Sequence, residues 1–164
     1  MQPNDAPEDP AIEDESGPRL VAAYPQALVS DVTRAADFYR ERLGFHVVYL
    51  YGEPPFYALV ERGGARINLR HVDEPARHRP PGDPDVLTAN IPVQGIESLF
   101  EELQVRGVDF AQTLKEQPWA ASDFLVRDPD GNLLCFANAV EDAPGPTRAR
   151  PEHRRSSGSK GLAR

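Results

Sequence analysis

The chain has 164 residues and a net charge of −8, and its content of 40% hydrophobic and 27% charged residues is normal for one soluble globular domain. It holds no apolar run of about 20 residues and opens without a basic and apolar leader, so we predict a cytoplasmic protein without a membrane partner. The acidic balance argues against nucleic acid as a partner, because phosphate binding requires clustered Lys and Arg. The single cysteine, Cys135, excludes an internal disulfide and a zinc site built from cysteines.

The two ends of the chain differ in composition from the part between them. Residues 1–18 carry six acids and no base, whereas residues 142–164 carry six bases and two acids. The first segment is rich in Asp, Glu and Pro and the second in Pro, Gly and Ser, which is typical of segments that cannot bury enough apolar surface to fold. We therefore predict two disordered tails around one domain at 19–141.

The first half of this domain predicts a strand, a helix and three further strands. Residues 20–30 alternate as a strand, and Asp31 and Gly44 have the positions of a helix N-cap and a left-handed C-terminal cap. Three strands are expected next, at 45–51, 56–61 and 65–71. The apolar residues between the two caps recur at helical spacing and are Val32, Ala35, Ala36, Tyr39 and Leu43.

The second half repeats this order after a proline-rich linker at 73–85. A strand is expected at 86–93, then a helix that ends at Arg106 and Gly107, a short strand near 108–111 and a hairpin at 116–139. The turn of the hairpin is expected at 128–132, where the sequence is DPDGN. Its proline fixes φ near the value that a turn requires, and its glycine adopts a positive φ without strain. The stripe of the helix is formed by Ile96, Leu99, Phe100 and Leu103.

Fixed offsets between the halves indicate an internal repeat. Asn68 and Cys135 are 67 residues apart, as are the turn glycines Gly64 and Gly131. The sequence therefore predicts an α+β fold of two tandem βαβββ modules, at 19–72 and 86–141.

These features together resemble the vicinal oxygen chelate (VOC) superfamily, which includes glyoxalases, extradiol dioxygenases and bleomycin-resistance proteins. The resemblance spans about 20–139. It implies that each module curls a mixed sheet around a cavity, and that two chains pair as a homodimer in which both partners build each cavity. The segments that carry it are 29–31 (VSD), 38–39 (FY), 43–45 (LGF) and 128–132 (DPDGN).

The resemblance also identifies the positions at which metal-dependent members of the superfamily hold their ion. Those positions carry Tyr24, Asn68, Thr88 and Cys135, and none is a carboxylate or an imidazole. Zinc prefers N and S donors and hard cations usually need a carboxylate, so this set is a poor cage for either. We therefore expect no metal or other cofactor and favour binding over catalysis. A lyase, isomerase or dioxygenase with an atypical metal site is the alternative.

Among metal-free members, the segment 116–119 (EQPW) before the hairpin resembles the bleomycin-resistance group. In that group the tryptophan-bearing segment lies beside the ligand groove, and protection comes from binding the drug. The resemblance therefore implies a small-molecule partner, an antibiotic of the bleomycin type, with Trp119 at the groove. The usual Gly-Arg-Glu type sequence is replaced here by 120–122 (AAS), which leaves the ligand open.

Strand alternation gives a second list of candidate ligand-binding residues, those that share a face with the four positions above. Phe56 joins them as an aromatic surface on which a flat ligand could stack. A solvated open sheet face is the competing interpretation of the polar members, and the two arginines favour an acidic ligand over a cationic one. The residues added in this way are Gln26, Arg66, Arg70 and Asn90, with Leu133 and Ala137 beside Cys135.

Overall fold

A computed structural model describes residues 18–78, 86–118 and 121–139. In the first module these form β1 (Gln26–Val29), α1 (Val32–Glu41), β2 (His46–Tyr51), β3 (Tyr57–Arg62) and β4 (Ala65–His71). After a 3₁₀ turn (Pro75–His78), the second module contains β5 (Leu87–Val93), α2 (Ile96–Val105), β6 (Phe110–Glu116), β7 (Ser122–Arg127) and β8 (Leu133–Asn138). The order confirms the predicted tandem βαβββ repeat. The two predicted tails lie almost wholly outside the described residues.

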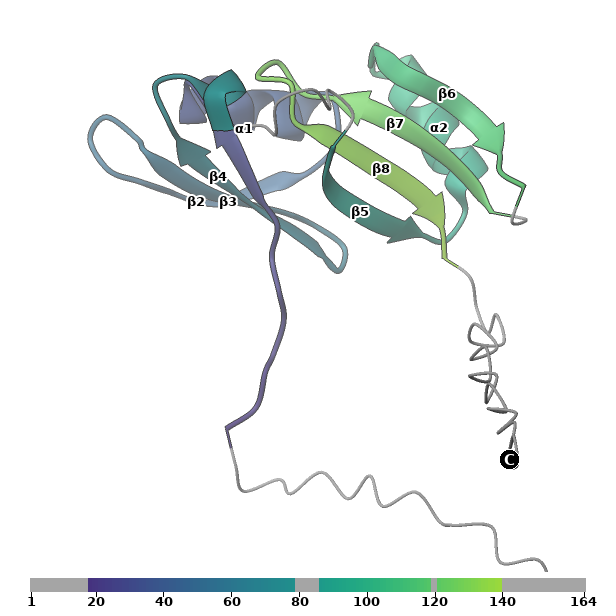
Figure 1. Cartoon of the computed structure of the whole chain (residues 1–164), viewed down its shortest axis with the longest axis horizontal. Helices are drawn as coiled ribbons and strands as arrows, with labels where there is room; N and C mark the ends of the chain where they lie inside the picture. Colours follow the sequence, from purple (N-terminus) through teal and green to yellow (C-terminus); the bar gives the residue numbers. More distant parts are fainter. Residues whose placement is uncertain (1–17, 79–85, 119–120, 140–164) are drawn as a thin grey trace, which may run out of the picture.

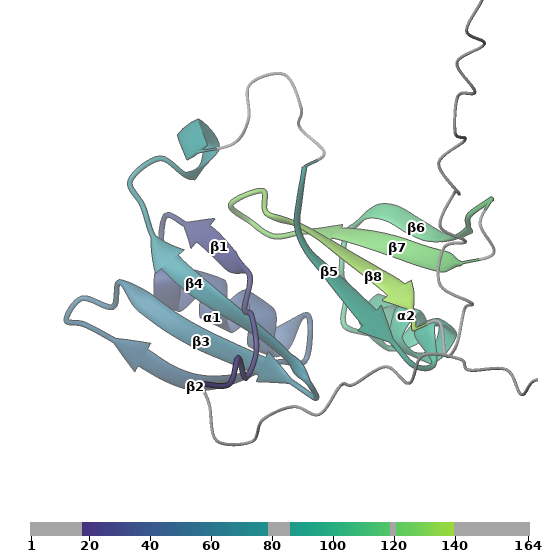
Figure 2. The same ribbon diagram turned by 60° about the horizontal axis from the view of Figure 1, so that its bottom comes forward.

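Each module folds into its own four-stranded mixed sheet. The strand order is β1-β4-β3-β2 in the first, sheet A, and β5-β8-β7-β6 in the second, sheet B. In both, the first strand pairs in parallel with the last, and the other pairs are antiparallel. The modules lie side by side with a helix on one face of each sheet (Figure 1), and the opposite, open faces come forward in Figure 2.

Helix α1 begins and ends where the sequence predicts. The Asp31 side chain accepts a hydrogen bond from the backbone N–H of Arg34 at 2.9 Å, which satisfies one free donor of the first turn. Its predicted apolar stripe is buried against sheet A. The helix ends before Gly44, whose φ of +71° lies in the left-handed region that glycine adopts without strain.

One hydrophobic core runs through both modules. The helix-facing residues of β4 and β8 are buried as predicted, and they include Ile67, Leu69, Leu134 and Phe136. Under α2 the core is aromatic, because Phe124 contacts Phe100 at a ring-centroid distance of 5.5 Å and Phe136 at 5.0 Å. The two modules therefore bury their apolar residues in one shared cluster.

At the C-terminal end of each helix, an arginine side chain binds a backbone carbonyl at the end of the other helix. Arg42 follows α1, and its Nη1 donates to the carbonyl oxygen of Arg106 at 2.6 Å. Arg106 follows α2, and its Nη1 donates to the carbonyl oxygen of Glu41 at 3.1 Å. Carbonyls at a helix C-terminus lack partners within the helix and carry partial negative charge, so a cation from the other module stabilises each end. The two arginines occupy equivalent places in the repeat.

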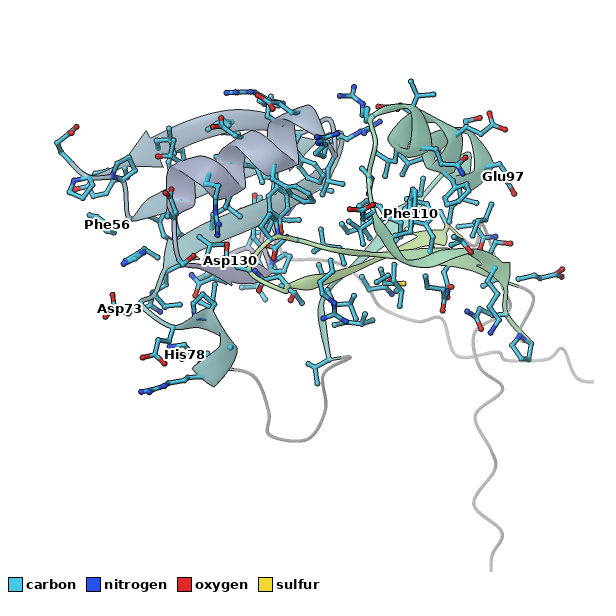
Figure 3. All side chains as sticks on the ribbon, turned by 90° about the horizontal axis from the view of Figure 1, so that it is seen from above. Phe56, Asp73, His78, Glu97, Phe110 and Asp130 are labelled. Carbon is cyan, nitrogen blue, oxygen red and sulfur yellow. The ribbon has the colours of Figure 1, made fainter. Side chains whose placement is uncertain are left out.

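The predicted turn at 128–132 forms a second connection between the modules. Asp128 is buried, and its carboxylate accepts hydrogen bonds from Tyr39 Oη at 3.2 Å and from Asn132 Nδ2 at 2.7 Å. Asn132 Nδ2 also donates to the carbonyl oxygen of Leu28 at 2.9 Å. Asp130 lies between the modules (Figure 3) and accepts from Ser30 Oγ at 2.6 Å. The turn therefore joins β8 to β1 and α1 of the first module.

Two elements differ from their predicted bounds. β1 is shorter, because the chain before Gln26 runs outside the sheet, and β6 extends to Glu116 although its sequence predicts only a short strand. Half-buried and exposed residues alternate along β6, but the half-buried positions include the polar Gln112, so the hydrophobic pattern of the sequence does not predict the full strand. None of the described helices is long and apolar enough to cross a membrane.

Candidate functional site

A cleft of about 1120 Å³ lies between the two modules. One wall is formed by the chain before β1 and by the hairpin between β3 and β4, around Gly63 and Gly64. The other wall is formed by β5 and the first turns of α2. Because each module supplies one wall, the cleft exists only when the modules are joined.

A row of polar side chains crosses sheet A and reaches the first wall of the cleft at Arg66. His46, Glu61 and Arg66 are direct neighbours on β2, β3 and β4. Arg66 donates from Nε to Glu61 and from Nη1 to Tyr24 Oη at 3.0 Å, and its guanidinium lies 5.6 Å from the Tyr24 ring centroid. His46 Nε2 lies 3.6 Å from a Glu61 carboxylate oxygen. Arg66 is thus held in place and its charge is balanced.

The two modules also meet through an ion pair in the cleft. Arg62 Nη2 donates to Glu102 Oε2 at 2.7 Å, and Arg62 Nη1 donates to the carbonyl oxygen of Leu43 at 2.6 Å. The hydrogen bond from Arg62 is the main cause that lowers the pKa of Glu102, and Arg106 adds to it. Glu102 is therefore ionised at neutral pH, and its two oxygens are already engaged.

The second wall is more neutral. Thr88, Asn90 and Pro92 of β5 line the cleft. Cys135 pairs with Asn90 in the sheet register, but its side chain is only 7% exposed. Burial, and secondarily Asp123, raises the pKa of its thiol, so Cys135 is a protonated thiol rather than a reactive thiolate.

The predicted site residues lie in different parts of the structure. Tyr24, Arg66, Thr88 and Asn90 line the cleft together. Gln26, Asn68 and Arg70 share the open face of sheet A with Arg66 but lie outside the cleft, and Phe56 is exposed in the turn before β3. Leu133 and Cys135 are buried, and Trp119 lies outside the described residues. The role of each in ligand binding stays a prediction.

Two charged residues of the cleft were not predicted from the sequence. Arg62 ends β3 and Glu102 lies on α2, whereas strand alternation tests only the residues that share a face with a chosen strand position. The one available signal was the spacing of Glu102 and Arg106, which are four residues apart on a helix and form an ion pair at 2.8 Å.

The four positions at which the superfamily resemblance expects metal ligands do not form a metal site here. Tyr24 and Thr88 line the cleft, whereas Asn68 lies outside it and Cys135 is buried. A phenol, an amide, a hydroxyl and a protonated thiol do not fit a zinc ion or a hard cation. Within 18–78, 86–118 and 121–139, no three His, Cys, Asp or Glu residues are grouped so as to hold an ion.

Known proteins share both the sequence pattern and the fold. The bleomycin resistance protein of Geobacillus stearothermophilus is 27% identical over 134 residues, which are 74% of this chain and 99% of that protein. A virulence protein of Salmonella typhimurium is 31% identical over 120 residues, 68% of this chain and 79% of that protein. The structure of the bleomycin-binding protein of Streptomyces verticillus, complexed with copper(II)-bleomycin, is similar with a TM-score of 0.61 and 26% identity, covering 75% of this chain and 99% of that one.

The sequence profile of one superfamily matches residues 22–136, which include both modules and every described residue of the cleft except the last, Ala139. The repeat, the two mixed sheets and the cleft between them agree with that match. The chain belongs to the Glyoxalase/Bleomycin resistance protein/Dioxygenase superfamily.

Proposed function

We propose that this protein binds an antibiotic of the bleomycin type in the cleft between its modules and retains it without altering it. The observation that carries the proposal is the cleft itself. Its volume of about 1120 Å³ exceeds the range of about 300–1,000 Å³ usual for drug-sized ligands, so it suits a larger molecule such as a glycopeptide. The names of the relatives from Geobacillus and Streptomyces support the same ligand class.

The chemistry of the walls supports binding rather than catalysis. Arg62, Arg66 and Glu102 are the charged groups among the described lining residues, and each is held by a partner within the protein. The lining hydroxyls belong to Tyr24, Thr88 and Ser98, and no described histidine lines the cleft to act as their base. Such a surface can donate and accept hydrogen bonds without supplying a nucleophile.

The first test is a cleft-filling substitution. Asn90→Trp places a large side chain on the β5 wall, and we expect it to weaken bleomycin binding at least about tenfold because it occupies ligand volume. Thr113→Trp is the matched control, since Thr113 is exposed on β6 but does not line the cleft. Isothermal calorimetry measures both affinities. The emission of Trp119, the only tryptophan of the wild-type chain, gives a second signal, which we expect to change saturably with ligand.

Two results would contradict the proposal. Wild-type affinity in Asn90→Trp would place the ligand outside the cleft. A change in the mass of bleomycin recovered after incubation, dependent on an added divalent metal, would instead indicate the atypical metal-dependent enzyme. We expect the recovered antibiotic to be unchanged and the affinity to be indifferent to pre-treatment of the protein with chelator.

The second test concerns the homodimer that we also propose. β2 is an edge strand, and four of its apolar and aromatic residues are exposed: Val48, Tyr49, Leu50 and Tyr51. An exposed apolar edge strand is a site at which a second chain can pair. We expect light scattering at tens of micromolar to give twice the chain mass of 18.1 kDa.

Leu50→Lys should shift this dimer toward monomer, because it places a charge among the exposed apolar residues of the edge strand. Val105→Lys is the matched control, because Val105 lies at the end of α2 and is 89% exposed. We expect this variant to remain a dimer. A wild-type protein that remains monomeric would contradict the dimer. The proposed setting is the cytoplasm, with no nucleic-acid or membrane partner.

A further inference from the structure

The edge of sheet B that faces the cleft carries main-chain groups without a partner in the sheet. β5 is an edge strand and pairs only with β8, so one side of β5 is free. That free side faces the first module (Figure 2), and residues 88–93 of the strand line the cleft. Although the first module lies next to it, none of the described strands of sheet A pairs with β5.

The hydrogen bonds of β5 identify which of its groups are free. The backbone N–H of Ala139, which follows β8, donates to the carbonyl oxygen of Val93 at 2.7 Å, so the main-chain groups of Val93 point toward β8. These groups alternate in direction along a strand, and those of Asn90 and Pro92 therefore point away from β8 and into the cleft. Pro92 has no N–H, which an edge strand tolerates on its free side.

The free groups are spaced as an extended peptide requires. Asn90 offers an N–H and a carbonyl oxygen, and Pro92 offers a carbonyl oxygen about 6.6 Å farther along the strand. The same distance separates every second residue of an extended chain, so a peptide can pair with both positions at once. The charged groups of the cleft already have partners within the protein, which leaves these neutral main-chain groups available to a ligand.

The side chains around this edge differ between its two faces. Leu99 and Phe136 line the cleft on the side of the helices, whereas Tyr24 and Asn90 line it on the open side of the sheets. Side chains of a strand alternate between its two faces. A peptide beside β5 would therefore place every second side chain against apolar residues and the others against polar ones.

We propose that the cleft binds an extended peptide by adding it to sheet B as a strand beside β5. The main chain of the peptide forms hydrogen bonds with Asn90 and Pro92, and its apolar side chains lie toward Leu99 and Phe136. This deepens the proposed function, on whose cleft it rests, because it assigns β5 to the peptide part of a glycopeptide ligand. It also implies that a peptide without any sugar binds there.

N-methylation of a peptide tests this geometry, because it removes a main-chain N–H and leaves the side chains unchanged. The probe is an acetylated and amidated pentapeptide of alternating serine and leucine, titrated into the full chain by isothermal calorimetry. One derivative is N-methylated on both leucines, and another on the central and the last serine. In an added strand, the N–H groups of leucines and serines point to opposite sides. We expect one derivative to bind at least about tenfold more weakly than the parent and the other within about threefold of it.

Two variants of the protein test the role of the β5 main chain. Asn90→Pro removes the N–H that points into the cleft and no hydrogen bond of the sheet. Asn90→Ala is the matched control, because it removes the side chain and keeps the N–H. We expect Asn90→Pro to bind the parent peptide at least about tenfold more weakly than Asn90→Ala does. Their thermal unfolding midpoints report folding, and the N-methylated peptides decide the proposal with the wild-type chain even where Asn90→Pro folds poorly.

The proposal is overturned by any of three results. They are the absence of saturable binding of the parent peptide, equal affinities of the two N-methylated derivatives, and equal affinities of folded Asn90→Pro and Asn90→Ala. Bleomycin should displace the peptide from the wild-type chain, and simultaneous binding of both would also contradict the proposal.

The peptide titrations and the bleomycin titrations fail separately. A chain that binds bleomycin but does not distinguish the two N-methylated derivatives would keep the proposed function and lose the added strand. A chain that distinguishes the derivatives but does not bind bleomycin would keep the peptide site and contradict the proposed antibiotic.

Discussion

Replacing Asp128 with alanine is expected to lower the free energy of unfolding by about 3 kcal/mol, because it leaves several buried donors without an acceptor. The carboxylate accepts from the backbone N–H of Asp130 at 3.0 Å and of Asn132 at 2.8 Å. It also accepts from Tyr39 Oη and from Asn132 Nδ2. Urea denaturation, followed by far-UV circular dichroism, measures the loss.

Two further variants separate this effect from a general loss of charge. Tyr39→Phe removes one of the four donors and should cost about 1 kcal/mol. Asp37→Ala removes an exposed carboxylate of α1 that forms an ion pair with Arg40, and should change stability by less than about 0.5 kcal/mol. An Asp128→Ala protein as stable as Asp37→Ala would show that the turn does not join the modules.

The effect of Asp128 should also depend on pH. Burial is the main cause that raises the pKa of its carboxyl, so the folded chain holds this proton more tightly than the unfolded chain. A raised pKa gives a contribution to stability that is complete below the unfolded pKa and declines as the pH rises through the folded one. The difference in stability between wild type and Asp128→Ala should therefore be larger at about pH 4 than at about pH 7. A difference that grows with pH would contradict this assignment.

Gly44→Ala is expected to destabilise the protein by about 2 kcal/mol for two reasons that act together. The φ of +71° at Gly44 is strained for any residue with a Cβ. A Cβ at this position would also lie 2.6 Å from Arg62 Nη1, and would displace the guanidinium that bonds Leu43 and Glu102. The ion pair between the modules should weaken with it.

Gly64→Ala is the control, since Gly64 has no positive φ and a Cβ there meets no atom within 4 Å. We expect its thermal unfolding midpoint to match that of the wild type. Gly44→Ala should also reduce bleomycin affinity, because Arg62 and Glu102 line the cleft. Equal midpoints for the two variants would contradict the role of Gly44.

The fold could be predicted because its signals are local and repeated. Asp31, Gly44 and the stripe of α1 each identify a helix boundary or face through residues close together in the chain. The 67-residue offset between the hairpins then related the second half to the first. β6 was the element whose length was underestimated, because its half-buried positions include the polar Gln112 and so do not form an apolar row in the sequence.

The site was predicted less completely than the fold. The family resemblance identified Tyr24 and Thr88, and period-two alternation added Arg66 and Asn90. All four line the cleft, and their role in ligand binding stays a prediction. Neither the resemblance nor the alternation could distinguish an open face from a covered one, and so the buried Cys135 was grouped with these residues. Contacts that join the modules, such as Arg62 with Glu102, depend on how two sheets pack and have no pattern within either strand.

The arginines that link the two helix ends should make the proposed binding cleft selective for ligand size. Its walls belong to different modules, so it can widen only if the modules move apart. That movement would break the bonds that Arg42 and Arg106 make to the opposite helix, together with the ion pair of Arg62 and Glu102. A molecule too bulky for the existing aperture would have to break all of these contacts before it made any of its own. We therefore expect the protein to discriminate among related ligands by their width, even where they carry the same polar groups.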